Sequence, residues 1–94
     1  VAELPEGVPV YIALDVDSMD PAVMPAVIGA AQGGLSYWQM MQLFEAIAER
    51  APICGFSMVE LMPARDLNGQ GALMASRLGL SMLGMIARQR AAVK

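Results

Sequence analysis

The stretch Val10–Pro21, with the sequence VYIALDVDSMDP, restricts the possible folds of this chain more than any other segment. An apolar run that is rich in β-branched and aromatic residues and is followed by turn formers is typical of a buried strand. Because side chains two residues apart on a strand share a face, we expect Asp15 and Asp17 to project together from its carboxyl end. That end is where open α/β sheets bind their ligands.

The D-x-D pair formed by Asp15 and Asp17 has two interpretations. Two neighbouring carboxylates repel each other, so they share a proton, stay hydrated or hold a cation. Carboxylate oxygens suit Mg, Mn or Ca, which makes the pair a candidate site for a hard divalent metal. The alternative is a solvated strand end without a ligand, and the motif alone does not decide between the two.

A second strand-like run, Ile53–Leu61, follows a well-marked helix. Ser36 is a favourable N-cap and Gln39 completes a capping box, while Pro52 is expected to end the helix. The order strand, helix, strand predicts a right-handed parallel βαβ unit. Glu60 lies near the carboxyl end of the second strand, so we expect it to reach the same sheet edge as the two aspartates.

The rest of the chain predicts a final helix that begins at Asn68 or Gln70 and runs to about Arg90. Its nearly apolar stretch Leu78–Ala87 is too short to cross a bilayer, which needs about 20 such residues. Two parallel strands are too few for a stable sheet, and parallel sheets need both faces covered. We therefore expect an α/β fold in which residues 1–94 form a single partial domain, the last βαβα portion of a doubly wound parallel sheet.

The composition excludes several kinds of partner. The 94 residues are 56% hydrophobic and 16% charged, an apolar excess that predicts self-association or burial against a missing N-terminal half. A net charge of −3 argues against nucleic-acid binding, and we expect no membrane partner. The single cysteine excludes an internal disulfide and, with no signal-peptide pattern at the N-terminus, favours a cytoplasmic location. The nine methionines are expected to fill the core.

Three segments, YIALDVDSMDPA, GGLSYWQMMQL and GFSMVELMP, stand in this order before a final apolar helix. Together, from about Val10 to Ile86, they resemble the C-terminal part of ureohydrolases, the family of arginase, agmatinase and formiminoglutamase. The resemblance implies a three-layer α/β/α fold and hydrolysis of a guanidino or related C–N bond at a binuclear manganese site. It also implies that Asp15 and Asp17 are Mn²⁺ ligands and that Glu60 binds the guanidinium group of a small substrate.

The chain departs from the pattern of that family in two places. The family's other metal ligands and its catalytic histidine lie on upstream histidine-containing motifs, and this chain has no histidine. We therefore identify no catalytic residue in it and expect it to be inactive alone. The loop that usually reads like GTGTPE-P-GG is AVIGAAQGG here, with Gly29 where a threonine is common near the substrate, so the substrate stays open.

Two other functions fit parts of the sequence. A phosphatase of the haloacid-dehalogenase type also places D-x-D after an apolar strand. It needs Thr or Val where Met19 stands and a later lysine, for which the chain offers only Lys94. A non-catalytic α/β interaction module, whose acids merely end strands, agrees with the apolar excess and the absence of histidine. An upstream reading frame with histidine-containing metal motifs would distinguish a ureohydrolase from both.

Overall fold

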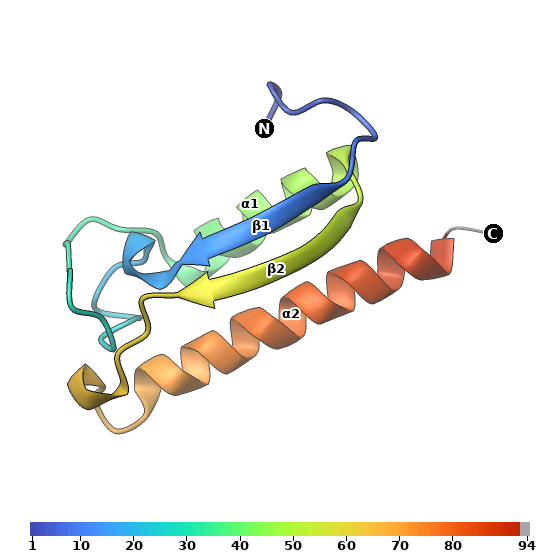
Figure 1. Ribbon diagram of the computed structural model, residues 1–94. Helices are drawn as coiled ribbons and strands as arrows, with labels where there is room; N and C mark the ends of the chain where they lie inside the picture. Colours follow the sequence, from blue (N-terminus) through green and yellow to red (C-terminus); the bar gives the residue numbers. More distant parts are fainter. Residues whose placement is uncertain (93–94) are drawn as a thin grey trace.

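The computed structural model describes residues 1–92 and contains two strands and two long helices in the predicted order (Figure 1). Strand β1 (Val10–Asp15) runs directly into a short 3-10 helix, η1 (Val16–Ser18). A long loop then leads into helix α1 (Tyr37–Arg50). The first half of the chain therefore forms the strand, loop and helix that its apolar pattern predicts.

The second half of the chain repeats this order of strand, loop and helix. Strand β2 (Ile53–Val59) is followed by the 3-10 helix η2 (Pro63–Arg65) and then by helix α2 (Gln70–Ala92). The predicted end of β2 at Leu61 is wrong, because the backbone leaves the strand after Val59. Neither long helix within residues 1–92 has the length and apolarity to cross a membrane. Lys94, weighed above as a phosphatase lysine, lies outside the described residues.

The two strands form a parallel sheet, as the βαβ pattern predicts. An unbroken register runs from Tyr11 opposite Gly55 to Asp15 opposite Val59. Both strands therefore end at the same edge of the sheet, and the segments that follow them start side by side. This βαβα arrangement confirms the predicted α/β fold class.

Helix α1 begins where its capping box predicts. The Ser36 hydroxyl accepts a hydrogen bond from the Gln39 N–H at 3.2 Å, and the Gln39 side chain accepts one from the Ser36 N–H at 2.9 Å. These two bonds satisfy backbone donors that the first turn of a helix leaves free. The inner face of α1 buries Met40, Met41 and Phe44, which anchors the helix to the sheet.

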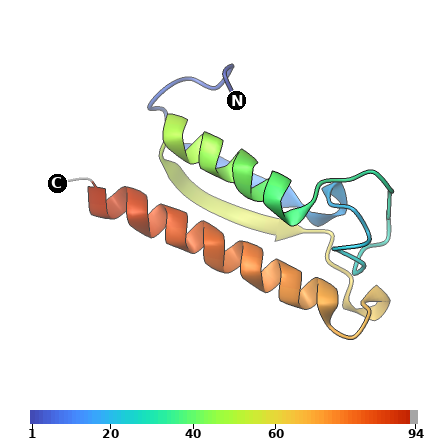
Figure 2. The ribbon, with the colours of Figure 1, turned by 180° about the vertical axis from the view of Figure 1, so that it is seen from behind.

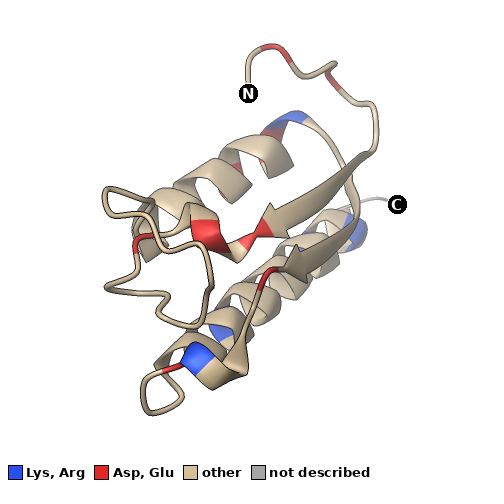
Figure 3. Cartoon of the chain, turned by 60° about the vertical axis from the view of Figure 1, so that its left-hand side comes forward, with Lys and Arg blue, Asp and Glu red and all other residues tan. Residues whose placement is uncertain are grey.

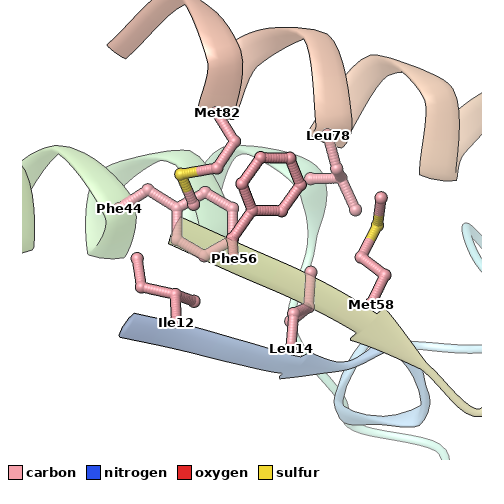
Figure 4. A pocket seen from close by; sticks show the side chains of 7 residues that line it. All are labelled: Ile12, Leu14, Phe44, Phe56, Met58, Leu78 and Met82. Atoms are coloured by element: carbon pink, nitrogen blue, oxygen red, sulfur yellow. The ribbon is translucent and has the colours of Figure 1, made fainter. Parts of the chain in front are cut away.

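Both helices cover the same face of the sheet (Figure 2). The core that they enclose contains side chains from four elements: Ile12 and Leu14 of β1, Phe56 and Met58 of β2, Phe44 of α1, and Leu78 and Met82 of α2 (Figure 4). The opposite face of the sheet is bare, with Tyr11 60% exposed and Val59 46% exposed. Residues 1–92 thus form two layers, a sheet and the helices on one side of it.

Gln89, near the end of α2, joins three elements that are distant in the sequence. Its side-chain oxygen accepts a hydrogen bond from the Ile53 N–H at 2.9 Å, at the start of β2. Its side-chain nitrogen donates to the carbonyl groups of Ala48 at 2.8 Å and Ala51 at 3.0 Å, at the end of α1. This glutamine fixes the end of the sheet opposite to the acidic residues.

Candidate functional site

The acidic residues singled out in the sequence gather at the carboxyl ends of the two strands (Figure 3). Asp15 is the last residue of β1, Asp17 lies in η1, and Glu60 directly follows β2. The register pairs Asp15 with Val59, the residue before Glu60. The acids that end β1 and follow β2 therefore lie at the same edge of the sheet. The convergence predicted from the βαβ order is therefore present.

The two aspartates lie close together for a different reason from the one expected. Asp17 does not continue the strand, so the predicted alternation of side chains along it is wrong for this residue. Instead, η1 folds the chain back, and the Asp17 N–H donates to Oδ1 of Asp15 at 3.1 Å. The Ser18 hydroxyl donates to the Asp15 carbonyl oxygen at 2.7 Å and closes the same turn.

The three acids influence one another electrostatically. The pKa of Asp17 is raised above its ordinary value, first by a side-chain hydrogen bond with Asp15, then by burial, and then by the negative charges of Asp15 and Glu60. Like charges disfavour ionisation of a carboxyl group, whereas a bound cation favours it. The edge therefore carries a concentration of negative charge that a cation would relieve.

Glu60 has a backbone conformation that is rare for its residue type. Its φ is 70°, in the left-handed region, where only glycine is free of steric penalty. This conformation ends the regular alternation of β2 and turns the chain immediately after the strand. Strain of this kind at a non-glycine residue occurs frequently at functional sites. The backbone of Glu60 therefore agrees with a functional role for this residue.

A loop between η1 and α1 returns to the site at both of its ends. The Leu35 N–H donates to the Ser18 carbonyl oxygen at 2.9 Å, and the Asp20 N–H donates to the Leu35 carbonyl oxygen at 2.9 Å. The Asp20 carboxylate accepts bonds from the N–H groups of Ala22 at 2.9 Å and Gly33 at 3.0 Å. These contacts hold the two ends of the loop together beside the aspartates.

Sequence reasoning did not assign a role in the site to Asp20 or to the contact of Gly29 with Asp17. Asp20 follows Asp17 by three residues and precedes Pro21, a pattern typical of a turn. This pattern could have predicted that Asp20 turns the chain beside the two other aspartates. Gly29 is different, because its approach to Asp17 depends on the path of the whole loop. A Cβ at position 29 would lie 3.3 Å from Oδ2 of Asp17.

The chemistry of the donor atoms fits a hard divalent cation, although their number is small. Asp15 and Asp17 offer neighbouring carboxylates, and their repulsion favours a cation between or beside them. Within residues 1–92, no group of three or more His, Cys, Asp or Glu side chains has a geometry that could hold a metal ion. The described residues therefore offer neighbouring carboxylates at this edge of the sheet but no complete metal site.

A model of the Arginase family matches residues 1–84 of the chain. N(1)-aminopropylagmatine ureohydrolase from Thermus thermophilus is 45% identical over 64 residues, which cover 68% of this chain and 20% of the relative. Agmatinase from Pyrococcus horikoshii is 33% identical over 88 residues, which cover 94% of this chain and 30% of the relative.

Solved structures show the same similarity. The proclavaminate amidino hydrolase from Streptomyces clavuligerus matches 88% of this chain and 28% of its own chain, with 30% identity and a TM-score of 0.81. The agmatine ureohydrolase of Thermoplasma volcanium matches 92% and 28%, with 30% identity and a TM-score of 0.78. The chain thus spans about a fifth to a third of the length of the relatives that it matches.

Proposed function

The chain belongs to the arginase family, and we propose that it supplies part of the metal and substrate site of a ureohydrolase that hydrolyses a guanidino or related C–N bond. One observation carries the proposal. Asp15, Asp17 and Glu60 come from two segments far apart in the sequence and follow strands that end at one sheet edge. The relatives named ureohydrolase and agmatinase support the class of reaction.

In this proposal Asp15 and Asp17 bind Mn²⁺. Ionised carboxylates are suitable ligands for it, and the metal, when bound, supplies Lewis acidity and a water of lowered pKa. The chain's own contribution is to hold the two carboxylates together through η1. Two carboxylates are too few ligands for tight binding, so we expect the chain alone to bind Mn²⁺ weakly and to lack activity.

The proposed role of Glu60 is to bind the substrate cation. A carboxylate facing a planar guanidinium group can accept two parallel hydrogen bonds, which fix the orientation of the group as well as its position. The left-handed backbone of Glu60 turns the chain at this point, directly beside the edge where Asp15 lies. Glu60 would thus orient a guanidino group next to the metal without binding the metal itself.

The proposal can be tested in a chimera. Residues 1–94 of this chain would replace the segment of Pyrococcus horikoshii agmatinase that they match, so that the rest of the site comes from the agmatinase. We expect the chimera to hydrolyse the agmatinase's own substrate and to bind manganese. Glu60→Gln should then lower kcat/KM by about 100-fold or more, because a desolvated cation loses its charged partner, while the manganese content stays unchanged.

Two variants complete this experiment. Asp15→Asn should lose manganese and activity together, whereas Glu49→Gln, at an exposed position on α1, should change neither. Near-normal kcat/KM in Glu60→Gln would contradict the proposed role of Glu60. A folded chimera with neither manganese nor activity would instead support the alternative function, a non-catalytic α/β interaction module, which the bare sheet face favours. The haloacid-dehalogenase alternative does not agree with membership of the arginase family.

A further inference from the structure

Asp20 fastens the two ends of the loop that connects η1 with α1. Its Oδ1 accepts a hydrogen bond from the Ala22 N–H at 2.9 Å, and its Oδ2 accepts one from the Gly33 N–H at 3.0 Å. Its own N–H donates to the Leu35 carbonyl oxygen at 2.9 Å. One residue therefore holds the start and the end of the loop in fixed positions relative to each other.

The closed loop is tightly packed. A Cβ on Gly34 would lie 2.6 Å from the backbone nitrogen of Asp20 and 2.6 Å from the carbonyl carbon of Met19, so a side chain there would force the ends of the loop apart. Inside the loop, Ala26 and Val27 are at most 2% exposed. Because close-packed groups transmit strain to their neighbours, opening the ends of this loop would displace its middle.

The middle of the loop is bonded to the segment that carries Glu60. The Met62 N–H donates to the Ala26 carbonyl oxygen at 2.7 Å, just beyond the end of β2 (Figure 1). Glu60 needs such support because its φ of 70° is strained, and strained residues persist only where the surrounding structure holds them. Since this bond joins two backbone groups, it does not depend on which side chains the loop carries.

We propose that Asp20 is a positioning residue for Glu60, because the loop that it closes holds the backbone directly after β2. This inference rests on the proposed function, in which Glu60 binds a guanidino group beside the metal ligands. Asp20 contacts neither metal nor substrate in this arrangement and acts only through the loop. The metal ligands do not need it, since the Asp17 N–H donates to Oδ1 of Asp15 within their own turn.

Loss of the Asp20 carboxylate should therefore weaken substrate binding and leave the metal in place. In the chimera with Pyrococcus horikoshii agmatinase, we expect Asp20→Ala to raise KM and to lower kcat/KM by about 10- to 100-fold, the effect of displacing a substrate-positioning group by about 1 Å. The manganese content should stay unchanged. Asp20→Asn keeps one side-chain oxygen that can accept a hydrogen bond, so its KM should lie between those of the wild type and Asp20→Ala.

A second measurement follows the loop itself in the 94-residue chain, without metal or substrate. Hydrogen exchange of the Met62 amide, measured by NMR relative to the amides of β1 and β2, reports how often its bond to Ala26 opens. We expect faster exchange in Asp20→Ala. Gln89→Ala is the matched control, because it removes hydrogen bonds to three backbone groups at the opposite end of the sheet. A general loss of stability would appear in both variants, and would reduce the amount of active enzyme without changing KM.

The outcomes separate this inference from the proposed function. Raised KM together with faster Met62 exchange in Asp20→Ala, and neither change in Gln89→Ala, supports the inference. Wild-type Met62 exchange, wild-type KM or a loss of manganese in Asp20→Ala overturns it, as do equal changes in Gln89→Ala. If Asp20→Ala does not fold, Asp20→Asn is judged by the same measurements. The proposed function fails by a different result, near-normal kcat/KM in Glu60→Gln, which does not involve Asp20.

Discussion

The local environments of three aspartates shift their pKa values in different directions: two are lowered and one is raised. The Asp66 carboxylate accepts hydrogen bonds from the N–H groups of Leu67, Gly71 and Ala72 at 2.7 to 3.0 Å, and thereby caps the first turn of α2. Bonds from Gly71 above all hold the pKa of Asp66 below its ordinary value, and those from Ala22 and Gly33 do the same for Asp20. Asp17, with acidic neighbours, has a raised pKa. Backbone donors therefore stabilise charge at two positions, whereas a hydrogen bond with Asp15, burial and neighbouring negative charges oppose it at the third.

The lowered pKa of Asp66 predicts sensitivity to acid. Its stabilising contribution is fully present above the unfolded value of 3.8 and is lost as the pH falls through the lower pKa of the folded state. Asp66→Asn should therefore lower the urea midpoint at neutral pH, and should lose less stability than the wild type on further acidification. Urea unfolding at several pH values measures both effects. An equal acid dependence in the two proteins would contradict the prediction.

The raised pKa of Asp17 predicts the opposite effect of pH on stability. The folded state disfavours the charged form, so destabilisation sets in as the pH rises from 3.8 through the raised folded pKa, and it persists above that value. Asp17→Asn should accordingly raise the melting temperature at neutral pH and leave it nearly unchanged well below 3.8. Thermal unfolding followed by circular dichroism tests this. A stabilised variant that no longer binds Mn²⁺ would show that the site is maintained at the expense of stability.

At the scale of elements, the local signals predicted most of the fold. The capping box at Ser36, the proline after α1 and the two apolar runs lie within a few residues of the boundaries that they set. Asp66 and Gln89 were not predicted as structural residues, because their partners are brought to them by the fold. The same holds for the site, since the sequence pointed to the acids and, through the family resemblance, to the loop near the substrate, but not to the approach of Gly29 to Asp17.

The loop between η1 and α1 also packs against the start of α2. A Cβ on Gly71 would lie 2.6 Å from Cβ of Ala26 and 2.9 Å from Oδ1 of Asp66, so neighbouring atoms would have to move. We expect Gly71→Ala to destabilise the protein by about 1–3 kcal/mol, the usual effect of overpacking. Gly84→Ala on the same helix should instead stabilise it by up to about 1 kcal/mol, because alanine is the better helix former.

Urea unfolding of the two variants provides the comparison. The same substitution on the same helix changes only the surroundings of the new methyl group, which are crowded at position 71 and open at position 84. If Gly71→Ala were as stable as Gly84→Ala, the contact between the loop and α2 would be looser than the structure shows. The loop beside the aspartates would then lack the support that we attribute to α2.

At the scale of the whole molecule, one face of the sheet has no covering layer within residues 1–92. Tyr11 and Val59 are exposed there, and both strands have an open edge. Unpaired edges and bare apolar faces favour association. Part of the apolar excess therefore lies on this face of the sheet, and part lies on α2, where Leu73, Leu80 and Leu83 are exposed.

We predict that this face mediates self-association of the isolated chain. Tyr11, whose ring lies over Gly55, is the largest side chain on it. Sedimentation velocity at micromolar concentration should show dimers or larger species, and Tyr11→Lys should shift them towards monomer. Leu80→Lys, at a 70% exposed position on α2, tests the other exposed apolar surface and should have little effect. A stable wild-type monomer, or dissociation caused only by Leu80→Lys, would rule out the sheet face as the contact.

The methionine-rich core has a consequence for the chemical lifetime of the protein. Six methionines are buried in it, namely Met19, Met24, Met40, Met41, Met82 and Met85. Oxidation converts a thioether to a polar sulfoxide that no longer fits an apolar interior. Peroxide can reach the sulfur atoms of the most deeply buried four, Met19, Met24, Met40 and Met82, only when the structure opens, and each oxidised sulfur then opposes reclosing. Oxidative ageing of this chain should consequently accelerate itself, at a rate set by how often the fold opens.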